Sequence, residues 1–204
     1  MNDQFELIAD GLAENGYAVI DHFLSNREVD SILDLGLFNK EYLNEFRKAG
    51  IGKRQGLQVN ESIRGDYIQW LDIDKAPIPL KVYLNRLNEL AAYLNRSLYL
   101  SLKAHEVHMT VYPAGSFYKR HLDQFRQDSH RKVSVICYLN HNWTEMDGGQ
   151  LRMYLSEGAI DFAPVSGRLI CFRSDQIEHE VLPARRDRIS LTGWLLDQAI
   201  DMKS

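Results

Sequence analysis

Two patterns of hydrophobic and polar positions divide the chain into an N-terminal part with helical periodicity, called the front here, and a C-terminal part in which apolar and polar residues alternate. In the front, apolar residues recur three and four positions apart between Phe5 and Leu12, and again between Leu80 and Leu98. Both stretches predict helices, and Gly16 is suited to end the first. Ser25 and Glu28 have the spacing of a capping box before a further helix. We also expect a short strand in "YAVIDHF", a helical piece at "KEYLNEFRKA" and a loop from Gly50 to Asp66.

From residue 104 the period changes to two, which predicts β-strands. Gly, Pro or Asp separates most of the short alternating segments: "AHEVHMTVY", "RKVSVICYLN", "GGQLRMYL", "GAIDFAP", "GRLICFR", "IEHEVLP" and "DRISLTGWLL". Seven or eight such strands are typical of a sandwich, a jelly roll or a barrel. Repeats and low-complexity linkers are absent from the sequence. We therefore expect one domain over 1–204, with a helical front at about 1–103 and a β core at about 104–197.

The last predicted strand has one apolar and one polar face. Its odd positions, from Ile189 to Leu195, are mainly apolar, whereas the even positions are Arg188, Ser190, Thr192 and Trp194. Residues two apart share a face of a strand. In an ordinary antiparallel sheet the polar face would meet water, whereas in a barrel that holds a ligand it would line the pocket. Tyr112 and Tyr138 lie on comparable mixed faces of their own strands.

Composition narrows the class of protein. The 204 residues are 45% hydrophobic and 25% charged, with a net charge of -4, so we expect a globular protein without a dedicated nucleic-acid surface. No apolar run approaches the roughly 20 residues that span a bilayer, and the acidic first residues do not resemble a signal peptide. We therefore expect a cytoplasmic protein with no membrane partner. Cys137 and Cys171 each lie in an apolar run and are expected to be buried free thiols.

Candidate chemistry comes from a His-x-Asp pair and two later residues. His121 and Asp123 are two apart, so both can point to one place, and His179 would complete a set of two imidazoles and one carboxylate. Such a set suits ferrous iron with positions left open, while zinc usually takes more thiolate or imidazole. Arg188 offers a planar fork for a carboxylate. Taken alone, each of these residues is more often a solvated surface residue.

Five segments together carry a family resemblance. They are "IRGDYIQW" (63–70), "VYPAGSFYKRHLD" (111–123), "VICYLNHNW" (135–143), "GGQLRMY" (148–154) and "HEVLPARRDRISLTGW" (179–194). This combination resembles the iron(II)- and 2-oxoglutarate-dependent oxygenases, and within them the prolyl 4-hydroxylases that act on hypoxia-inducible factor. The resemblance implies a mainly β fold with flanking helices (α+β). Its core would be a double-stranded β-helix, or jelly roll, with the N-terminal helices packed on one sheet.

The resemblance also assigns roles by position. It implies iron ligands at His121, Asp123 and His179. Co-substrate contacts or pocket walls are implied at Arg188, Tyr138, Tyr112, Thr192, Leu151 and Trp194. Substrate contacts are implied at Arg64 and Asp66, in a loop that closes over the peptide, and at Arg131 near the entrance, although the position of Arg131 is out of phase with Tyr138.

The implied activity is hydroxylation of a prolyl residue in a protein substrate. Fe(2+) would be the cofactor, 2-oxoglutarate and O2 the co-substrates, and ascorbate a candidate stimulant. The large regulatory regions of animal members have no counterpart in the 204 residues, which implies a bacterial-type member. Elongation factor Tu is then the first candidate substrate, and oxygen sensing a candidate role. Two alternatives stay open: the same chemistry on a free amino acid or other small molecule, and a catalytically silent binding or sensing module.

The sequence also departs from the family pattern. The turn in "YPAGSFYKRH" is one residue shorter than in the animal enzymes, and the stretch before His179 differs in length. His108 stands near a position that is apolar in those enzymes. These departures bear on pocket shape and on substrate identity, while the ligand set is complete.

Overall fold

The computed structural model describes residues 2–39, 46–49, 62–124 and 129–199. Three helices fall in the front half, as expected: α1 (Asn2–Glu14), α2 (Asn26–Leu33) and α3 (Ile78–Leu98). The strands of the described chain are β1 (Tyr17–Ile20), β2 (Arg47–Lys48), β3 (Tyr67–Trp70), β4 (Ala104–Tyr112), β5 (Tyr118–His121), β6 (Arg131–Tyr138), β7 (Leu151–Leu155), β8 (Gly158–Phe162), β9 (Leu169–Arg173), β10 (Glu178–Val181) and β11 (Arg188–Leu196). A 3-10 turn, η2, spans Glu145–Asp147.

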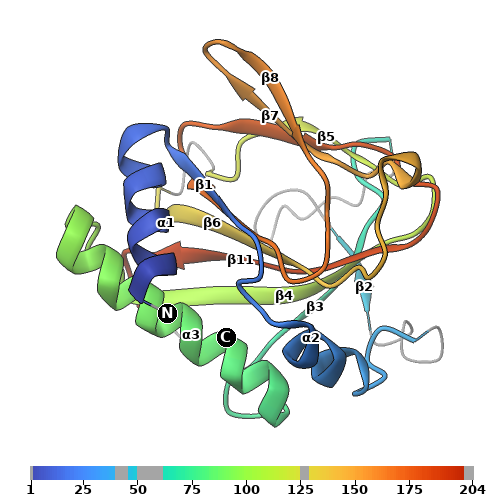
Figure 1. Ribbon diagram of the computed structural model, residues 1–204, viewed down its shortest axis with the longest axis horizontal. Coiled ribbons are helices and arrows are strands. Elements are labelled where there is room, and N and C mark those ends of the chain that lie inside the picture. The colour runs from blue at the N-terminus through green and yellow to red at the C-terminus, as the bar shows by residue number, and fades with distance from the viewer. Residues whose placement is uncertain (1, 40–45, 50–61, 125–128, 200–204) are drawn as a thin grey trace.

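The strands form two antiparallel sheets that face one another (Figure 1). The larger sheet has the order β1-β9-β6-β11-β4-β3-β2, and the smaller has the order β5-β10-β7-β8. From β4 to β11 most neighbours within a sheet are non-consecutive in the chain, because the chain passes repeatedly from one sheet to the other, as in a jelly roll. This mainly β architecture with flanking helices is the fold that the resemblance implied.

The helices cover the outer face of the larger sheet (Figure 1). Buried residues of α1 and α3 pack there with the odd-numbered residues of the central strands, including Val135 of β6 and Leu191 of β11. The free thiols Cys137 and Cys171 are buried in the same core, as predicted. Ser25 and Glu28 form the expected capping box at the start of α2. Because the odd-numbered residues of the central strands face the helices, the even-numbered residues of the same strands point into the space between the two sheets.

A second apolar cluster lies between the two sheets and includes Tyr138, Leu151 and Phe172. The even-numbered residues of β4, β6 and β11 therefore face the interior. Arg188, Thr192 and Trp194 of the polar face of β11 line a pocket between the sheets, which settles the choice left open by the pattern alone.

Some local expectations are corrected by the structure, and others lie outside the described residues. The helical piece expected at 40–49 lies partly outside the described residues, and its described end forms β2. Most of the loop expected from Gly50 to Asp66 also lies outside them. The strands β3 and β5 were not expected, because β5 alternates no apolar residues and the pattern of β3 is short. Among the described helices, none has the length and apolar character to cross a membrane.

Candidate metal and co-substrate site

A cavity of about 480 Å³ opens between the two sheets. It is lined by every residue that the sequence singled out for the site except Tyr138, which lies behind Arg188 and bonds to it. The wall from the larger sheet comes from the inner faces of β3, β4, β6 and β11, and β5, β7 and β10 supply the facing wall. Residues far apart in sequence thus meet in one cavity, because they occupy inward-facing positions on strands of the two sheets.

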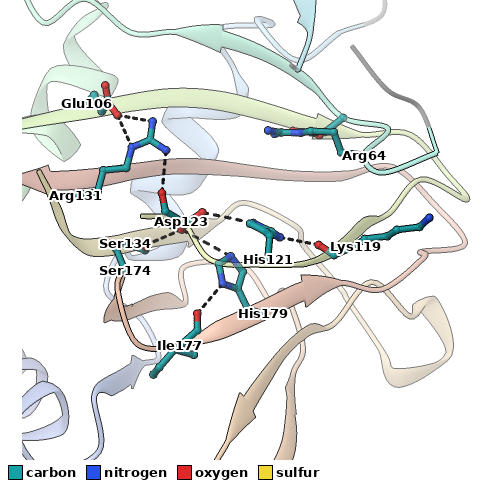
Figure 2. A network of polar contacts seen from close by, with 11 residues as sticks. Arg64, Glu106, Lys119, His121, Asp123, Arg131, Ser134, Ser174, Ile177 and His179 are labelled. Carbon is teal, nitrogen blue, oxygen red and sulfur yellow. Dashed lines mark hydrogen bonds and ion pairs between the residues drawn. The ribbon is translucent and has the colours of Figure 1, made fainter. Parts of the chain in front are cut away.

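The three predicted iron ligands meet at this cavity (Figure 2). His121 ends β5 and is the register partner of His179 in β10, while Asp123 follows β5 by two residues. The carboxylate of Asp123 lies 3.5 Å from Nε2 of His121 and 3.7 Å from Nε2 of His179. Ligands about 2.1 Å from one ion are separated by about 3 to 4 Å, so these distances fit a single metal ion. Among the described residues, no other group of three such side chains could hold a metal.

Both imidazoles are oriented by the backbone. Nδ1 of His121 donates to the carbonyl oxygen of Lys119 at 2.7 Å, and Nδ1 of His179 donates to that of Ile177 at 3.2 Å. A carbonyl can only accept, so each Nδ1 carries the proton and each Nε2 keeps its lone pair toward the cavity. This is the tautomer that a metal needs from histidine.

Protonation states also favour a metal. Burial lowers the pKa of His179 to about 4, although the charge of Asp123 opposes this, so the imidazole is neutral at neutral pH. Burial by itself would raise the pKa of Asp123. The adjacent His179 and His121 and the hydrogen bond from Ser134 outweigh burial and hold that pKa well below its usual range. An ionised carboxylate beside the neutral imidazole of His179 suits the donor set of a 2-His-1-carboxylate iron site.

Arg188 begins β11 at another part of the same cavity and is only 1% exposed. Its Nε donates to the carbonyl oxygen of Gly149 at 2.9 Å, and its Nη2 donates to the hydroxyl of Tyr138 at 3.2 Å. The guanidinium also lies over the ring of Tyr112, 5.2 Å from its centroid. Leu151 and Thr192 form neighbouring parts of the wall. The predicted co-substrate residues are thus brought together.

No carboxylate within the described residues pairs with Arg188. A buried charge is costly unless an opposite charge or hydrogen bonds compensate it, and the partners of Arg188 here are a carbonyl, a hydroxyl and the rings of Tyr112 and Tyr138, all of them neutral groups. The side chain faces a cavity large enough for a small acid. The arrangement therefore fits a carboxylate ligand that meets Arg188 at one end and the metal site at the other.

Arg64 and Asp66, predicted as substrate contacts, bind one another inside the cavity wall. Their side chains form a two-point ion pair with distances of 2.7 and 2.6 Å. The guanidinium of Arg64 lies 4.3 Å from the ring centroid of Tyr118, whose ring stacks on His121 at 3.6 Å. This pair therefore connects the wall of the cavity to a metal ligand, and its role toward a substrate stays a prediction.

Arg131 points into the cavity although its position is out of phase with Tyr138. The register between β6 and β11 shifts by one residue next to Leu196, which is the signature of a β-bulge. The extra residue turns Arg131 to the inner face, where it lies 3.5 Å from the ring centroid of Trp194. It also binds Glu106 through two nitrogens, at 2.9 and 2.7 Å. The bulge thus explains why Arg131 faces the cavity although its position is out of phase with Tyr138. Its contact with a substrate stays a prediction.

Several residues of the wall were not assigned a role from the sequence. His108 is buried beside Trp194, and its Nδ1 is 2.8 Å from the hydroxyl of Thr110. Trp70 is 51% exposed at the edge of the cavity and meets His108 edge-on. The even number of His108 on the predicted strand β4 matched the inner face, so strand phase was the signal that would have found it, whereas Trp70 lies on β3, which was not expected.

Comparison with known proteins agrees with this geometry. Residues 107–196 match the model of the 2OG-Fe(II) oxygenase superfamily. A *Caenorhabditis elegans* hypoxia-inducible factor prolyl hydroxylase is 28% identical over 95% of this chain. The chain spans 28% of the length of that protein and 46% of human Egl nine homolog 1, so it corresponds to a part of these relatives.

Solved structures extend the similarity over the whole fold. A *Pseudomonas putida* prolyl-4-hydroxylase is 40% identical, with 96% of this chain and 100% of that one covered and a TM-score of 0.85. A *Trichoplax adhaerens* prolyl hydroxylase, solved with a peptide fragment of hypoxia-inducible factor, is 29% identical, with 96% and 90% covered and a TM-score of 0.80. With the metal ligands and the buried arginine in place, the chain belongs to the 2OG-Fe(II) oxygenase superfamily, among the relatives of the prolyl 4-hydroxylases.

Proposed function

We propose that the protein hydroxylates a prolyl residue of a protein substrate, converting 2-oxoglutarate and O2 to succinate and CO2. The observation that carries the proposal is the buried Arg188, which has no carboxylate partner among the described residues and faces the cavity that holds His121, Asp123 and His179. This pairing of a carboxylate anchor with a metal triad is what a 2-oxo diacid requires.

Different residues would bind the metal and the co-substrate. Iron, when bound with its co-substrates, supplies the oxidising power for replacing a C–H hydrogen by hydroxyl. His121, Asp123 and His179 would hold it on one side and leave the other side open. Arg188, with Tyr138 behind it, would bind the far carboxylate of 2-oxoglutarate and set its orientation. The two packed sheets keep bulk water away from the reacting atoms.

A prolyl substrate is supported by the relatives and by the shape of the site. The *P. putida* protein is a prolyl-4-hydroxylase, and the *T. adhaerens* enzyme was solved with a peptide. The cavity here is wide, and its rim includes the exposed ring of Trp70, a surface suited to a polypeptide segment. Elongation factor Tu is our candidate substrate, because the bacterial branch of the family includes an enzyme that acts on it.

The test is succinate formation from 2-oxoglutarate with added ferrous iron, in air and without oxygen. Elongation factor Tu or a proline-containing peptide is supplied, and the same peptide with alanine at the target position is the control. We expect oxygen-dependent succinate that rises with the proline peptide only, with one added oxygen on proline by mass spectrometry. Succinate that no peptide or protein stimulates would favour a small-molecule substrate instead. Failure to bind iron or to form succinate would favour a silent module.

We also propose that the enzyme acts in the cytoplasm and that its turnover follows oxygen supply. The hydroxylated fraction of the substrate, measured in cells grown over a range of oxygen tensions, tests the dependence on oxygen. A constant fraction at all tensions would refute a sensing role.

A further inference from the structure

Two buried serines lie directly behind the aspartate of the metal site. Ser134 is in the middle of β6 and Ser174 directly follows β9, and their exposed fractions are 1% and 0%. Ser134 Oγ lies 2.7 Å from Oδ2 of Asp123, and Ser174 Oγ lies 2.8 Å from Ser134 Oγ (Figure 2). The three side chains form a continuous chain of hydrogen bonds that ends at a metal ligand.

Which oxygen donates in each of these hydrogen bonds follows from the acceptor at the end of the series. A carboxylate that binds a metal ion is deprotonated, so its oxygens can only accept. Ser134 must therefore donate its one proton to Oδ2. Its oxygen is then left as an acceptor toward Ser174, so the hydroxyl of Ser174 donates to Ser134. Each hydroxyl has one orientation, and the pair is not free to reverse.

Backbone contacts hold the same aspartate from two other sides. The carbonyl of Ser174 accepts from the amide of Gln124, the residue after Asp123, at 3.1 Å. A guanidinium nitrogen of Arg131 lies 3.4 Å from the carbonyl oxygen of Asp123 (Figure 2). The main chain is thus fixed independently of the serine hydroxyls. The serine hydroxyls additionally restrict rotation of the carboxylate about the Cβ–Cγ bond of Asp123.

We propose that Ser134 and Ser174 form a positioning relay that fixes the carboxylate of Asp123 for metal binding, with Ser174 acting only through Ser134. The inference rests on the metal site in the proposed function. Donation to Oδ2 holds the carboxylate in one rotation, with Oδ1 3.5 Å from Nε2 of His121 and Oδ2 3.7 Å from Nε2 of His179. Without it the carboxylate would turn, and the metal would lose a preorganised ligand. Partners behind metal ligands commonly change metal affinity by about 10- to 100-fold.

The test is a titration of the metal-free protein with Co²⁺, followed by visible absorption. We expect Ser134→Ala to weaken Co²⁺ binding by about 10- to 100-fold and to change the spectrum at saturation. Ser174→Ala should weaken it less, by several-fold. Ser134→Thr, which keeps a hydroxyl, should restore most of the affinity. Ser190→Ala is the matched control, since Ser190 is also buried in the inner face but bonds to Thr192 and to no metal ligand.

The double variant separates a relay from two independent contacts. If Ser174 acts only through Ser134, Ser134→Ala/Ser174→Ala should bind Co²⁺ as Ser134→Ala does, to within about twofold. Losses that simply multiply would refute the relay, and wild-type affinity in Ser134→Ala would refute any positioning role. If Ser134→Ala does not fold, Ser174→Ala and Ser134→Thr still decide, because the relay requires a loss in the first and retention in the second. Wild-type protein that fails to bind Co²⁺ would instead contradict the metal site itself.

Discussion

Replacing Arg188 with methionine tests the co-substrate site most directly. Methionine keeps much of the length of the side chain and removes the charge and the donors to Gly149 and Tyr138. Removing one partner of a buried, hydrogen-bonded charge pair costs about 2 to 5 kcal/mol. At 1.4 kcal/mol for each factor of ten, the KM for 2-oxoglutarate should rise by about 30- to 4000-fold. Metal affinity should stay unchanged, because Arg188 bonds to none of the metal ligands.

A second consequence appears in thermal unfolding. A ligand at 100 times its Kd stabilises a protein by about 2.7 kcal/mol, which is a rise in Tm of about 5 to 11 °C for a chain of this size. At the same concentration of 2-oxoglutarate, a variant with a Kd raised 30-fold gains only about 0.9 kcal/mol, or about 4 °C at most. The metal-loaded protein without oxygen is suited to this measurement, since no turnover then consumes the ligand.

Two variants make the comparison sharp. Arg188→Lys keeps a charge but not the planar fork, so its KM should lie between those of the wild type and Arg188→Met. Arg185→Met removes an exposed arginine three residues earlier and should change neither KM nor the shift in Tm. A wild-type KM in Arg188→Met, together with a full shift in Tm, would show that another residue holds the carboxylate.

Three further substitutions test the rest of the site and the sheet that supports it. Asp123→Ala should abolish both iron-dependent turnover and Co²⁺ binding while the fold is kept by circular dichroism; near-wild-type activity would remove Asp123 from the ligand set. Tyr138→Phe should raise the KM for 2-oxoglutarate by about 2- to 12-fold, the worth of one hydrogen bond to Arg188, and kinetics at varied 2-oxoglutarate check this. Gly193→Ala should destabilise the protein by about 1 to 3 kcal/mol, because a Cβ there would lie 2.3 Å from the carbonyl oxygen of Glu106; an unchanged Tm would contradict this.

Strand phase is what made the site predictable from sequence. The side-chain period of a strand is two, so the polar residues Arg188 and Thr192 had to share a face wherever β11 lay. The same rule placed Tyr112 and Tyr138 on inner faces. The direction of that face, toward water or toward a second sheet, depended on contacts distant in sequence. The family resemblance supplied it, and the helices on the other face of the sheet account for it physically.

The remaining features depend on pairing between strands, which the sequence does not display. The bulge that turns Arg131 inward exists only in the register between β6 and β11. The strand β5 is four residues long and rich in polar side chains, so no alternation marks it, yet it carries His121. Ser134 and Ser174 are 40 residues apart and meet only because β6 pairs with β9. Each became visible only when the sheets were assembled.

The metal ligands lie on or next to the smaller sheet, and one of them is hydrogen-bonded to the larger sheet. His121 and His179 belong to the smaller sheet, where they are direct register partners. Asp123 follows β5, but its carboxylate is bonded to Ser134 of the larger sheet. An ion held by all three would therefore join the two sheets through Asp123, at the open side where the cavity separates them. Arg188 belongs to the larger sheet as well, so the spacing of the two sheets sets the distance between carboxylate anchor and metal. Preorganisation of this site thus depends on how the two sheets pack. Residues that fix this packing, such as Ser134, should therefore affect binding of the co-substrate both at the metal and at Arg188.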